Sequence, residues 1–303
     1  MDVKAYIDFI DAILENAHFS DASLHSFRDK YNRIIDRYND STLYLSMLSS
    51  FSAGKSTLIN SLLGQKLLKA ANEATTAVPT FINSSKTDSV RISVKLRNGN
   101  VFHLDNPNEA EELSALLKVA IPQKIEDIIE LFTTDVLLKL GENTIHDNVS
   151  EVYVDVPNLK DAENICIIDT PGINAGGFDS AHHIGATIET LNANTDAALV
   201  LFPAHQAYTQ GFEEFLDKNA AAFLEDSIYV LSMMDLVEEN EHKEVIEYVR
   251  QNLKSHFLLT DPTILHCAAG KVRTSKKWAT QFSKFKKVLY SILKKNREQI
   301  LCK

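Results

Sequence analysis

Residues 49–57, SSFSAGKST, have the types and spacing that hold the phosphates of a nucleotide. Gly54 would let the backbone approach a phosphate closely, and successive N–H groups at a helix start would supply partial positive charge. Lys55 would reach the β- and γ-phosphates, and the Ser56 hydroxyl would bind Mg²⁺. The pattern G-x-x-x-x-G-K-[ST] begins with glycine, whereas this chain has Ser49, which fits with a negative φ or with mild strain. The stretch therefore predicts a phosphate and magnesium site with an altered first position.

Two further stretches carry residues that a γ-phosphate site needs. Asp169 ends the apolar run at residues 164–169 and would hold Mg²⁺ through a water molecule, while the N–H of Gly172 would sense the γ-phosphate. Thr75 or Thr76, in the stretch EATTAVPTF, could coordinate Mg²⁺ and hold the attacking water. Each stretch alone is more typical of an ordinary turn or loop. Their succession after the GKST stretch, in an α/β pattern, favours the functional interpretation.

The elements that would position these residues alternate between strands and helices. Strands are expected at residues 42–48, 90–96, 101–104, 151–156, 164–169, 197–202, 227–232 and 263–266. Helices are expected at residues 55–63, 181–193, 209–223, 239–256 and 275–300, with a polar-faced helical insertion at 107–141. This alternation predicts an α/β fold with a mostly parallel central sheet and helices on both faces.

Helical segments are expected at both ends of this core. Residues 1–40 have apolar side chains at helical spacing and are rich in acidic residues. Residues 275–300 carry an apolar stripe surrounded by lysines, and the N-terminal segment would be its natural partner. The stripe comprises Trp278, Phe282, Phe285, Val288, Leu289, Ile292 and Leu293. We expect three parts: N-terminal helices at 1–40, a nucleotide-binding domain at 41–272 and an amphipathic C-terminal helix at 273–303.

Composition disfavours several classes of protein. Hydrophobic residues make up 45% and charged residues 24% of the 303, as in ordinary globular chains. No apolar run approaches the roughly 18–20 residues that a membrane span needs, and acidic residues interrupt the N-terminal apolar segment, unlike a signal peptide. Three cysteines are too few and too scattered for a disulfide framework or a zinc site. Such cysteine usage fits the reducing cytoplasm best, and the net charge of −10 leads us to expect that the chain binds no nucleic acid.

The stretches FSAGKSTLINSLLG, TTAVPT and IIDTPGINAG together resemble the GTPase domain of the dynamin superfamily, most closely its bacterial branch. The chain departs from the family at Ser49 and Ser50, where the loop usually begins with Gly-Glu-Phe or Gly-Gln. The resemblance implies that Ser52 contacts the region between the β- and γ-phosphates and that Thr76 is the switch threonine. Ile173 stands where small GTPases carry a water-orienting glutamine. The family instead completes its active site by dimerising across the nucleotide face.

Guanine recognition is expected at residues 232–235, SMMD. The family has [NT]-K-x-D here, with the lysine along the purine and the aspartate accepting hydrogen bonds from guanine. Asp235 is present, but Met233 replaces the lysine, so we expect guanine preference with reduced affinity. Adenine lacks the matching donors and would leave a buried aspartate unpaired. The backbone of Ala268, in HCAAGK, is expected to complete the base pocket.

The candidate site residues fall into three groups by expected role. Those expected to serve catalysis are Ser52, Lys55, Thr76 and Gly172, and those expected to hold Mg²⁺ are Ser56, Thr76 and Asp169. Those expected to contact the nucleotide are Ser50, Ala53, Gly54, Lys55, Ser56, Thr57, Ser232, Asp235 and Ala268.

The resemblance also implies an activity and partners. It implies Mg²⁺-dependent hydrolysis of GTP to GDP and phosphate, and a homodimer or heterodimer across the nucleotide face. It further implies a P-loop GTPase fold whose flanking helices form a partial neck. Membrane remodelling, with peripheral attachment at the inner membrane, would act through a stalk outside these 303 residues or through a partner chain.

Two other functions stay open at the level of the sequence. One is a nucleotide-binding scaffold with little turnover, which Ser49, Ser50 and Met233 suggest. The other is a P-loop ATPase, in which Asp235 would be an accident of sequence. Replacement of Asp235 by asparagine separates the guanine reader from the ATPase, because only the former would lose affinity for GTP.

Overall fold

The computed structural model separates the chain into two compact units, Met1–Thr42 and Leu43–Lys303. The described residues are 9–10, 12–13, 42–50, 52–69, 78–133, 148–157, 159, 162–171, 185, 187–188, 190–191, 195–207, 209–221 and 224–301. In the first unit, residues 9–10 and 12–13 are helical, and most of the predicted N-terminal helices lie outside the described residues. The division of the chain into three parts therefore stays a prediction.

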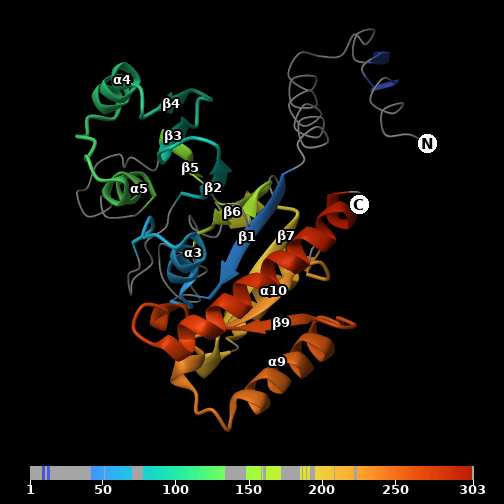
Figure 1. The fold of residues 1–303 in the computed structure, drawn as a ribbon. Coiled ribbons are helices and arrows are strands. Elements are labelled where there is room, and N and C mark those ends of the chain that lie inside the picture. The colour runs from blue at the N-terminus through green and yellow to red at the C-terminus, as the bar shows by residue number, and fades with distance from the viewer. Residues whose placement is uncertain are drawn as a thin grey trace. The chain divides into compact units, whose positions relative to one another are not determined.

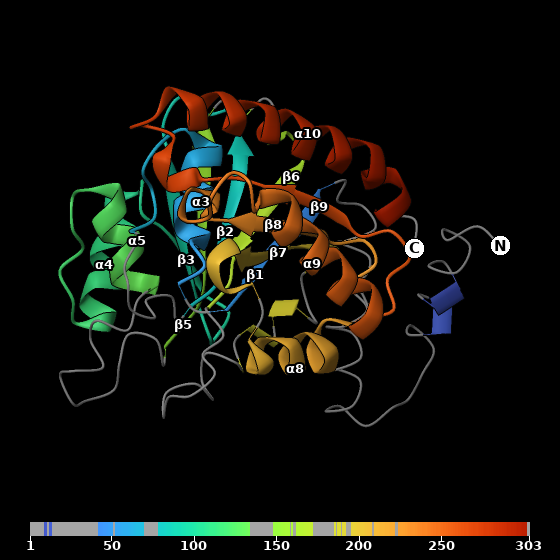
Figure 2. The same cartoon turned by 90° about the horizontal axis from the view of Figure 1, so that it is seen from below.

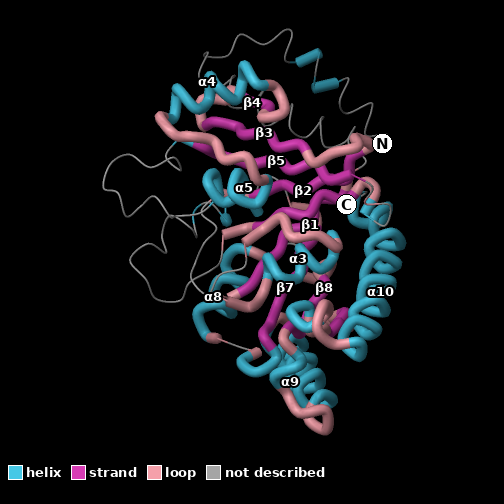
Figure 3. The backbone as a smooth tube through the Cα atoms, turned by 60° about the vertical axis from the view of Figure 1, so that its left-hand side comes forward, coloured by secondary structure: helices cyan, strands magenta, loops and turns pink. Residues whose placement is uncertain are grey.

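A nine-stranded sheet, counted over the described residues, forms the centre of the larger unit (Figures 1 and 3). Its order is β4-β3-β5-β2-β6-β1-β7-β8-β9. The strands are β1 (Leu43–Ser49), β2 (Thr80–Ser85), β3 (Arg91–Leu96), β4 (Val101–His103), β5 (Val149–Pro157), β6 (Ile165–Asp169), β7 (Ala197–Pro203), β8 (Ile228–Ser232) and β9 (Thr263–His266). Strands β6, β1, β7, β8 and β9 run parallel to their neighbours within this group. The predicted mostly parallel sheet is thus confirmed.

The other half of the sheet has mixed directions. Strand β2 is parallel to β5 but antiparallel to β6, and β3 is antiparallel to both β5 and β4. The turn between β3 and β4 contains Gly99 at φ 92°, a conformation that glycine adopts without strain. This turn confirms the hairpin that the spacing of the two strands predicts.

Strand β2 is the element that the sequence pattern did not predict. Its sequence, TFINSS, becomes polar in its second half and does not alternate in the manner of a half-buried strand. Tertiary contacts satisfy that polar half: the Asn83 side-chain amide donates to the Asp155 carboxylate, and the Ser84 hydroxyl donates to the Leu159 carbonyl. Pairing with β5 and β6, rather than local propensity, therefore makes this segment a strand.

Six long helices flank the sheet among the described residues. They are α3 (Lys55–Leu63), α4 (Pro107–Leu117), α5 (Ile125–Thr133), α8 (Gln210–Asn219), α9 (His242–His256) and α10 (Lys276–Leu301). The predicted helical insertion at 107–141 is divided, because Lys118 closes α4 at φ 55° and Pro122 lies in the connection to α5. The remainder of that insertion, and most of the predicted helix at 181–193, lie outside the described residues.

Helices cover both faces of the sheet, as Figure 2 shows for α10 and α8 on opposite sides. One core cluster joins α3, α5 and α10 to one face, and its members include Leu58, Phe132 and Phe285. A second cluster joins α8 and α9 to the other face through Phe212 and Leu253. The nine-residue helix α3 is thereby fixed against the centre of the sheet, directly after β1.

The predicted apolar stripe of α10 is largely correct but includes one error. Phe282, Phe285, Leu289 and Leu293 are buried in the core, whereas Val288 is 45% exposed. Tyr290, which the stripe omitted, is buried in its place because it faces the same core. The core that α10 covers belongs to the sheet, and the predicted packing on the N-terminal helices lies outside the described residues. No helix in the described part of the chain is long and apolar enough to cross a membrane.

Candidate nucleotide-binding site

The candidate residues gather at the carboxyl ends of the parallel strands. The loop after β1 leads into α3, Asp169 is the last residue of β6, and Ser232 is the last residue of β8. Ala268 follows β9 after one residue. Carboxyl ends of parallel strands meet at one edge of a sheet, where α/β proteins bind their ligands. The fold therefore brings residues from four separate stretches to one place.

The loop after β1 has two residues in the left-handed region. Ser52 is exposed at φ 56°, and Gly54 precedes α3 at φ 85° and ψ 28°. The Leu58 N–H donates to the Gly54 carbonyl at 2.9 Å, which starts the helical hydrogen bonding. No side chain among the described residues caps the start of α3, and no acidic residue lies in its first turn. A helix start with neither a side-chain cap nor an acidic residue of its own in the first turn suits the binding of an anion.

Gly54 also lies against the residue that replaces the family's base-flanking lysine. A Cβ built on Gly54 would lie 3.3 Å from Cε of Met233, which is closer than most Cβ contacts. Met233 itself has a positive φ of 55°, and this backbone conformation places its side chain over the phosphate loop. The Met233 side chain and the phosphate loop are therefore packed together, and a side chain at position 54 would disturb both.

Replacement of Gly54 by alanine is expected to destabilise the fold by about 1–2 kcal/mol, because non-glycine residues are strained in the left-handed region. The variant should also lose nucleotide affinity, since the new methyl group pushes against Met233. Gly64→Ala is the matched control: Gly64 has a φ of 72° at the end of α3, but a Cβ there meets no atom within 4 Å. Thermal unfolding should show a loss in both variants, and titration with GDP should show a loss in Gly54→Ala alone. Equal GDP affinity of the two variants would contradict this prediction.

Ser49, the unusual first residue of the loop, sits without strain. It is the last residue of β1, so its backbone is extended, and its side chain is buried. Its hydroxyl donates to the Ser50 carbonyl at 2.7 Å and accepts a hydrogen bond from Lys55 Nζ at 3.1 Å. The serine therefore holds the ammonium group of Lys55 close to the loop.

Lys55 donates to this hydroxyl and is close enough to Asp169 to feel the charge of its carboxylate. Burial lowers the pKa of Lys55 from its ordinary value, and the negative charge of Asp169 opposes that shift. Asp169 is buried at the end of β6, and its neighbour Thr170 donates a hydrogen bond to the Met47 carbonyl of β1 at 2.6 Å. A phosphate group bound here would stabilise the charged form of Lys55 through charge-assisted hydrogen bonds.

The oxygen atoms near this lysine suit Mg²⁺. Ser56, in the first turn of α3, offers a hydroxyl, and Asp169 offers a carboxylate. The described residues contain no cluster of three or more His, Cys, Asp or Glu side chains. Mg²⁺ commonly binds through one or two protein oxygens, several waters and the phosphates of a substrate. The donor set therefore fits a magnesium ion that arrives with a nucleotide.

Residues 232–235, which the sequence predicts to read the base, are hydrogen-bonded to the loop after β1 and to the loop after β9. The Ser232 hydroxyl donates to the Ala53 carbonyl at 2.7 Å, and the Met234 N–H donates to the Cys267 carbonyl at 3.2 Å. Ala268 is buried beside this link. These hydrogen bonds set the two loops at a fixed distance from the phosphate loop, as a pocket for one base would require.

Asp235 lies in this corner with its side chain 14% exposed, and Lys271 Nζ lies 4.0 Å from its Oδ2. Sequence reasoning did not single out Lys271, which follows Ala268 by three residues in a short 3₁₀ turn. Position 233, where the family has a lysine, is a methionine in this chain. Lys271 instead brings a positive charge close to Asp235. The sequence signal was its proximity to Ala268 in the HCAAGK stretch.

Of the remaining predicted site residues, some are described by the structure and others lie outside the described residues. Ser50 follows β1 and is partly buried, and Thr57 lies in the first turn of α3, its methyl group 3.9 Å from a Cβ built on Gly270. Thr76 and Gly172, the expected switch residues, lie outside the described residues, as do Thr75 and Ile173. The metal and phosphate roles of Thr76 and Gly172 stay predictions.

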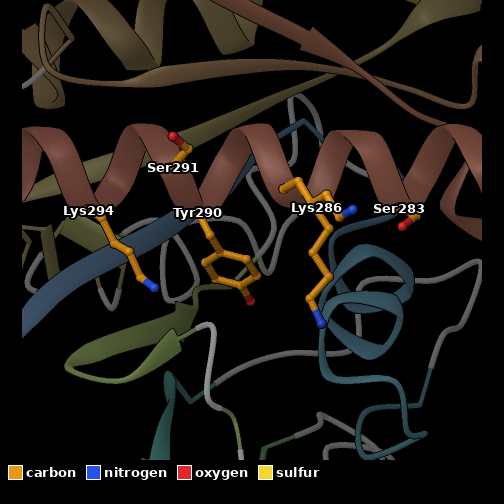
Figure 4. A pocket seen from close by; sticks show the side chains of 6 residues that line it. Ser283, Lys286, Tyr290, Ser291 and Lys294 are labelled. Carbon is orange, nitrogen blue, oxygen red and sulfur yellow. The ribbon is translucent and has the colours of Figure 1, made fainter.

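A separate hollow of about 510 Å³ lies beside α10 (Figure 4). Its described lining residues all belong to that helix: Ser283, Lys286, Lys287, Tyr290, Ser291 and Lys294. Lys286 Nζ lies 5.7 Å from the centre of the Tyr290 ring. None of the candidate nucleotide residues that the structure describes lines this hollow, so the candidate site rests on the geometry of the loops at the carboxyl ends of the strands.

Comparison with known protein families decides the identity of this domain. The model of the dynamin family matches residues 47–234, which is more than half of the 303 residues. The chain belongs to the dynamin family. The matched range of this dynamin-family chain contains the last three residues of β1, the loop that follows it, Asp169 and the SMMD stretch up to Met234. Membership at this level makes it a P-loop GTPase by family, and confirms the resemblance and the fold class predicted from the motifs.

Individual relatives cover most of this chain. Dynamin-like protein 2 of Campylobacter jejuni subsp. jejuni serotype O:23/36 (strain 81-176) is 23% identical over 227 residues, covering 72% of this chain and 30% of the relative. Dynamin-like protein 1 of the same strain is 23% identical over 270 residues, covering 82% of this chain and 35% of the relative. This dynamin-family chain therefore spans about a third of the length of these relatives.

A solved structure of an oligomerised bacterial dynamin pair, described in terms of long-range sensing and tethering of membranes, has a similar fold. It is 17% identical, with a TM-score of 0.59 over 98% of this chain and 44% of that one. At this identity the likeness concerns the fold of the two chains. The fold of the dynamin-family domain described above is thus shared with a chain about twice its length.

Proposed function

We propose that this dynamin-family chain is a Mg²⁺-dependent GTPase domain that hydrolyses GTP to GDP and phosphate and is completed by dimerisation across its nucleotide face. The observation that carries the proposal is the meeting of Lys55, Asp169 and Asp235 at one sheet edge, around a loop whose Gly54 is left-handed. In this proposal Lys55 would bind the phosphates, Asp169 would bind the metal and Asp235 would bind the base.

The phosphates would be bound by groups that already face the loop. Lys55 would exchange the hydrogen bond that it donates to Ser49 for one to the β- or γ-phosphate, while the N–H groups at the start of α3 bind the phosphate oxygens. Mg²⁺, when bound, would neutralise charge that develops on the phosphates during transfer. Ser56 and Asp169 would hold this ion, and Ser52 would lie near the bridge between the β- and γ-phosphates. Positioning and charge neutralisation would therefore supply most of the catalysis.

The switch residues would respond to the γ-phosphate. Thr76 would coordinate Mg²⁺ and orient the attacking water, and the Gly172 N–H would contact the γ-phosphate. Both contacts would be lost after hydrolysis, which is the usual way in which such segments change state. A nucleotide-dependent dimer would then form and dissociate with the state of the phosphate.

The base would be chosen by Asp235, with Ser232 and Ala268 shaping the pocket. Guanine offers N1–H and N2–H₂ to a carboxylate, whereas adenine offers neither. Asp235 is only 14% exposed, so adenine, which offers its carboxylate no donor, would bind less well than guanine, and this favours the GTPase over the ATPase. The membrane connection proposed for the domain rests on family membership and would act through a segment or partner outside these residues.

Calorimetric titration with Mg²⁺ and, separately, GDP, a non-hydrolysable GTP analogue and ADP tests this proposal. We expect heat from the guanine nucleotides and none from ADP. Release of phosphate should then be measured over a series of protein concentrations, where dimer formation predicts that activity per molecule rises. Binding without turnover at any concentration would favour the scaffold, and equal heats for ADP and GDP would favour the ATPase.

A further inference from the structure

The first residue of β2, Thr80, has a buried hydroxyl group that forms no hydrogen bond within the described part of the chain. Thr80 is 1% exposed, and its Oγ1 has no hydrogen-bond partner among the residues that the structure describes. Buried hydroxyl groups are nearly always paired, because an unpaired one loses its hydration without compensation. This hydroxyl therefore requires a partner that is not part of the described protein, or a rearrangement of a group close to it.

The position of Thr80 in the sheet identifies the neighbouring group. Thr80 lies directly opposite Asp169 in the antiparallel pairing of β2 with β6. Residues directly opposite in such a pair point to the same face, with Cβ atoms about 4.5–5.5 Å apart. The next opposed pair on this face, Ile82 and Ile167, belongs to the core cluster under α3. The hydroxyl and the carboxylate thus share the face on which α3 begins.

Packing alone gives no reason for a threonine here. On its other side Thr80 is in register with Val152 of β5, which is apolar and fully buried. Valine has nearly the shape of threonine and would fill this space without burying a hydroxyl, a change that is often neutral or stabilising where the hydroxyl is unpaired. The hydroxyl therefore points to a function on the side of Asp169.

We propose that Thr80 is a positioning residue of the metal site, whose hydroxyl donates a hydrogen bond to the Asp169 carboxylate when Mg²⁺ and nucleotide are bound. The inference rests on the proposed function, in which Asp169 holds the metal through water. A carboxylate that serves a metal is usually oriented by a hydrogen bond of its own, and loss of such a bond weakens metal binding. Thr80 would supply that bond from a neighbouring strand.

The test is the affinity of the chain for Mn²⁺ in the presence of GDP, measured by electron paramagnetic resonance. Thr80→Val should lower this affinity by about tenfold or more, and Thr80→Ser should retain it because the hydroxyl remains. Thr133→Val is the matched control, since Thr133 is also buried but its hydroxyl donates to the Ile129 carbonyl within α5. The control should bind Mn²⁺ as the unaltered chain does.

A second measurement separates positioning from a structural role. With metal and nucleotide removed by chelation and dialysis, Thr80→Val should raise the melting temperature, because it removes a buried unpaired hydroxyl. A lower melting temperature of this variant would overturn the proposal, and so would unchanged Mn²⁺ affinity in a chain that binds Mn²⁺ and GDP when unaltered. If the unaltered chain bound neither, the proposed function would fail, and the role of Thr80 with it.

Discussion

Replacing Lys55 by methionine is expected to lower the rate of GTP hydrolysis by roughly 10²–10³-fold, the usual effect of removing one donor to a developing negative charge. Methionine keeps much of the length of the side chain but has no cation for the β- and γ-phosphates. Lys55 is already partly desolvated, as its lowered pKa indicates, so an apolar chain fits the same space. The Ser49 hydroxyl would keep its bond to the Ser50 carbonyl. We therefore expect the folded structure to be retained while turnover falls.

Phosphate release under saturating GTP, together with the unfolding temperature of the nucleotide-free protein, checks this expectation. Lys66→Met serves as the control, because Lys66 is 56% exposed and pairs on the surface with Glu126 at 3.7 Å. Surface pairs of this kind contribute little, so the control should hydrolyse GTP as the unaltered chain does. A Lys55→Met variant with undiminished turnover would show that the loop after β1 is not where the phosphates bind.

Asp235→Asn is expected to weaken GDP binding by about 3 kcal/mol, or roughly a hundredfold, because two charge-assisted hydrogen bonds to guanine are lost or reversed. The asparagine amide can still donate a hydrogen bond, which suits a base with a carbonyl group at C2. Xanthosine diphosphate has that group, so the variant should gain affinity for it relative to GDP. This exchange of preference would assign the base contact to position 235 itself.

Calorimetric titration of GDP, xanthosine diphosphate and ADP into the variant and the unaltered chain measures the exchange. Asp217→Asn is the control, since Asp217 lies exposed on α8 and pairs with His256 at 2.9 Å, away from the candidate site. Unchanged GDP affinity in Asp235→Asn would instead support the ATPase, in which this aspartate has no part in binding.

The sequence by itself predicted the strand, loop and helix around Gly54, the buried strands other than β2 and the residues that end them. Gly54, Lys55 and Ser56 are consecutive, so their geometry depends on one turn and one helix start, and short-range patterns specify such features well. Asp169 and Asp235 were also found from the sequence, because each follows a run of apolar residues that forms a buried strand of the parallel sheet. The resemblance to the dynamin family was also inferred from these motifs, and the family model confirms it.

Only the tertiary structure decided how these stretches meet. Strand β2 has no alternating pattern and exists because β5 and β6 satisfy its backbone and polar side chains. The unpaired Thr80 hydroxyl and its register with Asp169 therefore could not be read from the sequence. Likewise, the contact between Lys271 and Asp235 joins loops after two different strands. Local sequence specifies a turn or a strand, whereas contacts between distant segments depend on sheet order and register, which long-range pairing sets.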